Sequence, residues 1–132
     1  SAKLLVPFLE HEDLFNDSAQ QLCRLGDASV RPDVERLYGR RFQPAVRKLL
    51  LGALLSRLGD DRARAYMEKK TRALFLETRV WAIHALGLAQ TPWAQKKLAE
   101  IASERPGSQE AETAIDALMS AEKIMDESRE LP

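Results

Sequence analysis

The chain has 132 residues, of which 45% are hydrophobic and 30% are charged, so it is neither disordered nor collagen-like. Its 20 Lys and Arg balance its 20 Asp and Glu, and the zero net charge falls below the basic excess typical of nucleic-acid-binding domains. The longest apolar run, Leu49 to Leu55, has 7 residues, far short of the ~20 that span a bilayer.

Helix formers dominate the composition. Leu and Ala supply 20 and 18 residues, whereas Val, Ile and Thr together supply 13. We therefore predict an all-α protein. Its helices are expected, in chain order, over residues 2–9, 13–25, 32–38, 44–58, 61–72, 76–87, 92–104 and from 109 onward.

Glycine, proline and capping residues punctuate this series. Gly59 is placed as a left-handed C-terminal cap, and Thr91 followed by Pro92 is typical of a helix N-terminus. Arg105-Pro106-Gly107 breaks the chain, after which Ser108 is predicted to cap the last helix. Pro7 is predicted to kink the first helix without ending it.

A repeat of about 32 residues organises the helices into pairs. Leu22-Cys23-Arg24-Leu25-Gly26-Asp27 recurs as Leu55-Ser56-Arg57-Leu58-Gly59-Asp60. The anchor leucines of the units are Leu22, Leu55, Leu86 and Leu118. We predict one domain over 1–132, with units at about 1–27, 28–60, 61–90 and 91–127. The second helix of each unit is apolar around much of its circumference, which predicts that neighbouring units cover it.

The second helices also carry a family resemblance. Ala45-Val46-Arg47 with Ala53 to Asp60, and Thr78-Arg79 with Ala82 to Gly87, resemble HEAT repeats, most closely the short bacterial kind of phycobilisome lyase-like proteins. The resemblance is good in units two and three and weaker in one and four. It implies a right-handed α-solenoid of about four stacked hairpins, whose second helices line a concave face. It also implies bridges between units, at the positions of Asp27, Asp60, Arg47 and Arg79, and we expect both arginines to contact carboxylates.

The sequence offers little catalytic chemistry. The two histidines and one cysteine form no metal-ligand spacing, and nucleophile elbows and phosphate-binding glycine loops are absent. We predict a protein that is not an enzyme and that holds no metal or cofactor. A single cysteine, Cys23, excludes an internal disulfide and suits a cytoplasmic location. Because its counterparts in the other units are small or apolar, we predict a buried, inert thiol.

Positive charge is concentrated in the middle of the chain. Residues 28–79 carry a net charge of +7, between acidic flanks. One interpretation is a solvated outer face rich in intrahelical pairs. The other is a basic belt that faces an acidic partner such as nucleic acid: Arg31, Arg36, Arg40, Arg41, Arg47, Lys48, Arg57, Arg62, Arg64, Lys69, Lys70 and Arg72.

The anchor leucines also set a register for the concave face. The positions at −9, −5, −2 and +2 from each anchor form a mostly polar stripe on the second helix. Unit one supplies Asp13, Asp17, Gln20 and Arg24, unit three Glu77, Trp81, His84 and Leu88, and unit four Gln109, Thr113, Asp116 and Ser120. Unit two gives Val46, Leu50, Ala53 and Arg57, but its spacing of 33 residues indicates a one-residue slip that leaves its register open. Trp81, with His84 one turn later, is the predicted contact for a partner, and packing of Trp81 against an adjacent unit is the alternative.

The leading functional hypothesis is a protein-interaction scaffold that binds a partner protein or peptide on this face. A nucleic-acid-binding module that uses the basic belt is the alternative, and an accessory subunit of a lyase-like enzyme is a third.

The opening segment Leu4-Leu5-Val6-Pro7-Phe8-Leu9 is apolar on nearly every side, whereas a terminal repeat needs a polar outer face. We therefore expect a fragment of a longer protein, or a homodimer through the first helix.

Overall fold

The computed structural model describes the backbone of residues 2–130 and the side chains of residues 2–120. Over this range the chain is helical and contains no strand, which confirms the all-α prediction. The elements are listed in chain order: η1 (Ala2–Leu4), η2 (Val6–Glu10), α1 (Phe15–Leu25), η3 (Ala28–Val30), α2 (Arg31–Tyr38), α3 (Ala45–Arg57), α4 (Arg64–Lys70), α5 (Leu76–Ala89), α6 (Pro92–Glu104) and α7 (Gln109–Glu130). None of these helices has the length and hydropathy needed to cross a bilayer.

The helix boundaries follow the capping residues of the sequence. The Thr91 hydroxyl accepts a hydrogen bond from the Ala94 amide at 3.2 Å, and the Ser108 hydroxyl accepts one from the Ala111 amide at 3.1 Å. Gly59 has a φ of +95°, a conformation that costs other residues energy. The predicted starts of α6 and α7 and the predicted glycine cap after α3 are therefore confirmed.

Two predicted helices differ from those in the structure. The single kinked helix over 2–9 is instead two 3₁₀ segments, η1 and η2, with Pro7 in the first turn of η2, where its missing amide proton costs nothing. The helix expected from residue 61 begins only at Arg64. Asp60 causes this delay, because its carboxylate accepts a hydrogen bond from the Arg62 amide at 3.0 Å and holds the chain in a turn.

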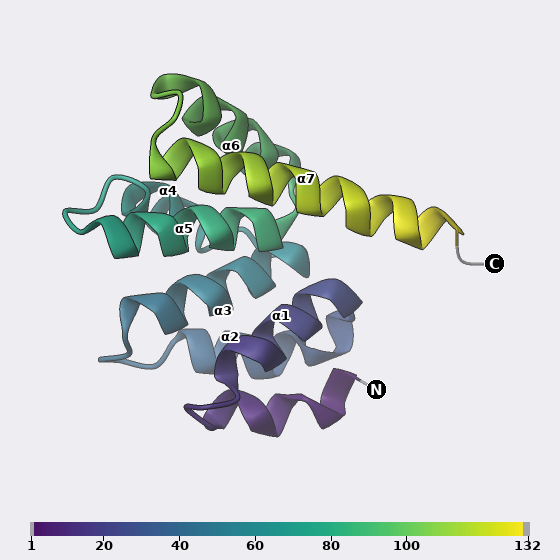
Figure 1. Ribbon diagram of the computed structural model, residues 1–132. Coiled ribbons are helices and arrows are strands. Elements are labelled where there is room, and N and C mark those ends of the chain that lie inside the picture. Colours follow the sequence, from purple (N-terminus) through teal and green to yellow (C-terminus); the bar gives the residue numbers. More distant parts are fainter. Residues whose placement is uncertain (1, 131–132) are drawn as a thin grey trace.

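The α-helices lie in two layers (Figure 1). In one layer α1 packs on α3, α3 on α5 and α5 on α7. In the other, α2 packs on α3, α4 on α3 and α5, and α6 on α5 and α7. Each second helix of a unit therefore contacts its own partner and the second helices of the adjoining units. This arrangement explains why α3 and α5 are apolar on several sides.

The core divides into two clusters that meet at α3. Leu50 and Leu54 belong to the cluster shared with α1 and α2, whereas Leu49 and Ala53 belong to the cluster shared with α4 and α5. All residues from Leu49 to Ser56 are buried. The prediction that the helix of unit two is covered by its neighbours is confirmed.

Glycine allows two pairs of helices to approach closely. A Cβ atom on Gly52 of α3 would lie 2.7 Å from the Cβ of Ala63, next to the start of α4. A Cβ atom on Gly87 of α5 would lie 2.8 Å from the Cβ of Ala117 in α7. Because real Cβ contacts are longer, neither position accepts a side chain without movement of a helix.

Cys23 is fully buried in the first cluster, as predicted, and burial raises the pKa of its thiol to about 12. Since the thiolate is the reactive form, we expect no reaction with a disulfide reagent such as DTNB at pH 8 in the folded protein. Labelling should proceed at the rate of unfolding and become rapid in denaturant. Fast stoichiometric labelling without denaturant would contradict this prediction.

The apolar opening segment is only partly covered. Leu4 is 71% exposed and Phe8 is 40% exposed, whereas Leu9 is buried. The expected homodimer through this segment therefore stays a prediction. Sedimentation equilibrium should show a concentration-dependent dimer that the double substitution Leu4→Glu, Phe8→Glu converts to a monomer. Leu74→Glu, at an exposed leucine elsewhere, is the control, and a strictly monomeric wild type would end the hypothesis.

Candidate binding groove between α1, α5 and α7

A groove of about 330 Å³ lies where α5 is flanked by the last turn of α1 and the middle of α7. Six of its lining residues occupy the positions that the repeat register assigns to the concave face: Arg24, His84, Leu88, Thr113, Asp116 and Ser120. The groove is completed by Gly87, Gln90 and Ala117. Three of the predicted partner-binding residues, His84, Thr113 and Asp116, are thus brought together.

Helical periodicity explains this convergence. His84 and Leu88 are four residues apart on α5, as Asp116 and Ser120 are on α7, so each pair lies on one face of its helix. The space between the two helices is set by Gly87 and Ala117, whose small size lets α5 and α7 approach. The register alone did not reveal this pair, although two small residues at facing positions are a readable signal.

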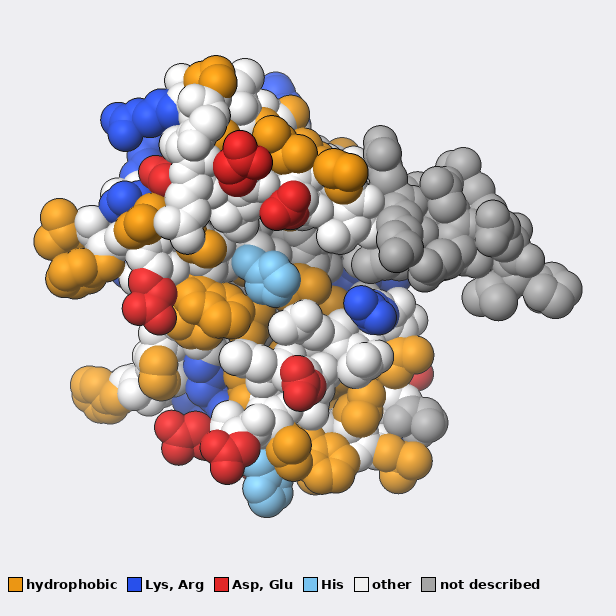
Figure 2. Space-filling model, viewed as in Figure 1, with side chains coloured by type: hydrophobic (Ala, Val, Ile, Leu, Met, Phe, Trp, Pro, Cys, Tyr) orange, Lys and Arg blue, Asp and Glu red, His pale blue; other side chains and the backbone are white. Residues whose placement is uncertain are grey.

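The groove is amphipathic. Arg24 stands on the α1 side and Asp116 on the α7 side, and both are exposed, whereas Leu88 is half-buried between them. Figure 2 shows the same face of the molecule, where hydrophobic and acidic side chains gather over α5 and its neighbours and Lys and Arg are sparse. A ligand that meets this surface encounters opposite charges at its two sides and an apolar contact in the middle.

Trp81 occupies an intermediate position. Its side chain is half-buried and packs against both core clusters, and it does not line the groove itself. Its ring lies edge-on to His84, with ring centroids 5.6 Å apart and an interplanar angle of 79°. Trp81 is therefore neither the fully exposed contact nor the fully buried packing residue that the two interpretations described; it supports the ring of His84.

Burial lowers the pKa of His84 below its ordinary value. Because the unfolded chain keeps a histidine pKa of about 6.5, it binds a proton before the folded chain does as the pH falls. The free energy of unfolding should therefore decrease below pH 6.5. This decrease should be smaller in His84→Gln than in the wild type. Urea titrations of both proteins at several pH values measure it, with His11→Gln, at an exposed histidine, as the control. A dependence on pH that is unchanged in His84→Gln would contradict the prediction.

Besides Trp81, the remaining predicted members of the concave face lie outside the groove. Asp13, Asp17, Glu77 and Gln109 are exposed and Gln20 is half-buried. In unit two the register is wrong, because Val46, Leu50 and Ala53 pack in the core. Arg57 is a correction: its guanidinium packs against Gly26, where a Cβ atom would overlap it, and its Nε is buried without a hydrogen-bond partner among the described residues. The reason is that α3 is enclosed by α1, α2, α4 and α5 and presents no open face.

Most of the predicted basic belt is paired within the molecule. Arg36 and Arg40 contact Glu10, Arg62 contacts Asp60 and Glu35, and Arg64 contacts Glu68. The ammonium groups of Lys48 and Lys70 lie over the Tyr66 ring. Arg41, Lys69 and Arg72 are exposed. These contacts agree with the solvated outer face and leave little free charge for a polyanion.

The predicted bridges between units are partly present. Asp60 pairs with Arg31 at 3.3 Å and with Arg62 at 2.7 Å, and so joins units two and three; these partners hold the pKa of its carboxyl below the usual range. Asp27 is a correction: among the described residues it forms no ion pair, and its carboxylate instead accepts a hydrogen bond from the Ser29 amide at 2.9 Å, two residues along the chain. Arg79 meets Glu110 of α7 at 3.5 Å.

Arg47 requires a correction. It was expected to contact a carboxylate, but it donates a hydrogen bond to the Leu9 carbonyl at 2.7 Å, and its guanidinium lies 4.4 Å from the centroid of the Phe15 ring. Both contacts join the start of α3 to η2 and to the start of α1. The electron-rich face of the Phe15 ring and a backbone oxygen replace the acidic partner that the resemblance implied.

Comparisons with protein families, with curated proteins and with solved structures found no match for this chain. Within the described side chains, no group of three or more His, Cys, Asp or Glu is arranged to hold a metal ion. The groove must therefore be interpreted from its own geometry. Its side chains present charge, hydroxyl groups and apolar surface, which are the elements of a binding site for another molecule.

Proposed function

We propose that this chain is a non-catalytic scaffold that binds a segment of a partner protein in the groove between α1, α5 and α7. One observation carries the proposal: six side chains that an independent sequence register assigned to one face line a single groove. Stacking places equivalent positions of successive repeats on one face, but it does not require them to be polar, whereas here they supply charges and hydroxyl groups to one groove.

The proposed architecture is a right-handed α-solenoid of four HEAT-like hairpins. The successive packing of α1, α3, α5 and α7, with α2, α4 and α6 on the other side, supports it, as does the Asp60 bridge between units two and three. In such an array the second helices form the surface that contacts partners. The groove lies on those helices.

The chemistry of the groove specifies the kind of partner segment. An acidic side chain would meet Arg24, a basic one would meet Asp116, and an apolar one would cover Leu88 beside Gly87. These three contacts fit a short peptide that carries an apolar residue between opposite charges. Rim charges of this kind orient a ligand more than they strengthen its binding.

A peptide library displayed on phage tests the proposal. Selection on the folded protein should enrich sequences in which an apolar residue is flanked by acidic and basic residues. Asp116→Lys should weaken the selected peptides by about tenfold or more, because it replaces an attraction by a repulsion. Ser120→Trp, which places a large ring at an exposed position of the groove lining, should abolish their binding.

Arg41→Glu is the matched control, because it also changes an exposed charge but lies outside the groove. It should leave peptide affinity within about twofold. Circular dichroism of each variant verifies that the fold is kept. The proposal fails if no common motif is enriched, or if the selected peptides bind Asp116→Lys as well as they bind the wild type.

A further inference from the structure

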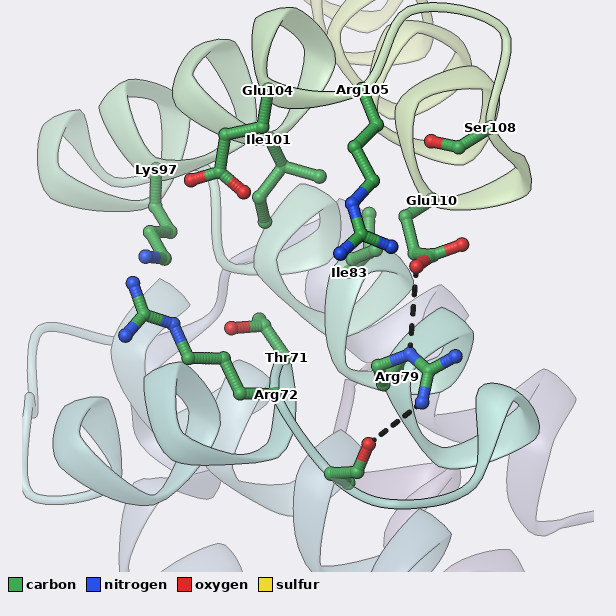
Figure 3. A pocket seen from close by; sticks show the side chains of 11 residues that line it. Thr71, Arg72, Arg79, Ile83, Lys97, Ile101, Glu104, Arg105, Ser108 and Glu110 are labelled. Carbon is green, nitrogen blue, oxygen red and sulfur yellow. Dashed lines mark hydrogen bonds and ion pairs between the residues drawn. The ribbon is translucent and has the colours of Figure 1, made fainter.

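A second cavity, of about 440 Å³, lies at the opposite end of α5 from the groove (Figure 3). It is enclosed by the turn between α4 and α5, the end of α6 and the turn between α6 and α7. Ile83 and Ile101, both buried, give it an apolar base. Arg72, Lys97 and Arg105 bring positive charge to it from three different segments. We call it the cationic cleft.

These three cations are poorly neutralised. Among the described residues, neither Arg72 nor Arg105 has a carboxylate oxygen within 4.0 Å of its guanidinium. The Lys97 ammonium has one such neighbour, a Glu100 carboxylate oxygen at 3.9 Å. The Lys97 side chain is 16% exposed, so little water is left to solvate its charge. Figure 3 shows the side chains of Arg72 and Lys97 extending toward one another, and that of Arg105 extending into the cleft.

Arg79 lines the same cavity but is occupied. It donates hydrogen bonds to the carbonyls of Ala73 and Leu74, at 2.8 and 2.9 Å, and pairs with Glu110 at 3.5 Å. These contacts fix the turn between α4 and α5, and they therefore fix the backbone position from which the Arg72 side chain extends. They also neutralise Glu110, one of the two carboxylates that line the cleft. Glu104 is then the lining carboxylate left to balance the charges of the three cations.

Arg72 and Lys97 extend toward one another across the cleft, so their charges repel, and an anion bound between them removes that repulsion. A polyanion fits this cleft poorly, because Glu104 at its margin repels any further negative charge. A single compact dianion fits better, since a guanidinium presents donors in the fork geometry that matches phosphate oxygens and a lysine adds a point charge. The apolar base accommodates the carbon skeleton attached to the anion.

We propose that the cationic cleft binds a phosphate monoester. Arg72, Lys97 and Arg105 contact the phosphoryl oxygens, and Ile83 and Ile101 contact the organic group. The site is separate from the groove between α1, α5 and α7 and shares none of its residues. The phosphoryl group belongs either to a small molecule or to a phosphorylated peptide, and the chemistry of recognition is common to both.

Isothermal titration calorimetry with phenyl phosphate and with a short phosphothreonine peptide tests the proposal. We expect phenyl phosphate to bind with a Kd on the order of 1 mM or lower, and phenyl sulfate, a monoanion, to bind more weakly. Affinity should rise between pH 5.5 and 7.5, because the second phosphate pKa is about 6. A peptide that binds at least about tenfold tighter than phenyl phosphate identifies a peptide source; otherwise the source is a small molecule.

Arg72→Gln and Arg105→Gln should each weaken phenyl phosphate binding about tenfold, since each removes a charged hydrogen-bond donor. Arg41→Gln makes the same change of net charge on an exposed side chain outside the cleft and should leave the affinity within about twofold. All three arginines are exposed, so the thermal midpoints should stay unchanged. Absence of binding by both phosphate probes, or equal weakening by Arg41→Gln, overturns the proposal.

Discussion

Leu54→Ala is expected to lower the free energy of unfolding by about 2–5 kcal/mol, the range typical of a large-to-small change in a core. Leu54 is fully buried in the middle of α3, within the cluster shared with α1 and α2. Loss of its side chain leaves a cavity that the two layers of helices cannot close, because α3 is held on both sides. Urea denaturation followed by circular dichroism measures the change.

Leu74→Ala is the matched control. It removes the same atoms from a leucine that is 84% exposed in the turn between α4 and α5. Its effect on the free energy of unfolding should stay within about 0.5 kcal/mol. If the two substitutions cost the same, or if Leu54→Ala costs less than about 1 kcal/mol, then α3 is not the centre of the core.

The sequence predicted the helices well where the signal was local. Thr91 and Ser108 cap α6 and α7 as expected, because a short polar side chain before a helix satisfies a free backbone amide whatever the tertiary structure. The anchor leucines also placed His84 and Asp116 on one surface, since helical periodicity carries a register over several turns. Asp60 delayed α4 for an equally local reason, a turn that competes with the helix.

The sequence failed where partners distant along the chain decide the outcome. The sequence predicts a carboxylate partner for Arg47, but its guanidinium binds the Leu9 carbonyl. It places Arg57 on the concave face, but the Arg57 guanidinium packs against Gly26. The basic belt was predicted from the net charge of residues 28–79. The ion pairs of Arg62 and Arg64 show that nearby carboxylates neutralise much of this charge. The cationic cleft was missed because its three cations lie in separate segments and only the fold brings them together.

The groove and the cationic cleft depend on the same structural element. His84 and Leu88 of α5 line the groove, and Arg79 and Ile83, on earlier turns of that helix, line the cleft. The close contact of Gly87 with Ala117 fixes α5 against α7, and α7 contributes to both cavities. A substitution that moves these two helices apart should therefore alter both sites, whereas substitutions on α2 should alter neither.

Gly52→Ala tests the close packing of α3 against the start of α4. Alanine normally strengthens a helix by up to about 1 kcal/mol relative to glycine. Here the added methyl group would lie 2.7 Å from the Cβ of Ala63, so the helices must move apart at an expected cost of about 1–3 kcal/mol. We expect a net loss in the free energy of unfolding, measured by urea denaturation.

Two further variants separate this overlap from a general effect of glycine replacement. Gly39→Ala adds the same methyl group at the end of α2, where the nearest atom is 3.6 Å away, and should leave the free energy of unfolding unchanged or slightly higher. The double variant Gly52→Ala, Ala63→Gly exchanges the two residues and removes the overlap while it keeps the total volume. It should recover most of the loss, because the methyl group on α3 then occupies the space that Ala63 vacates. If the double variant is less stable than Gly52→Ala alone, contact between these two positions is not what limits the packing of α3 and α4.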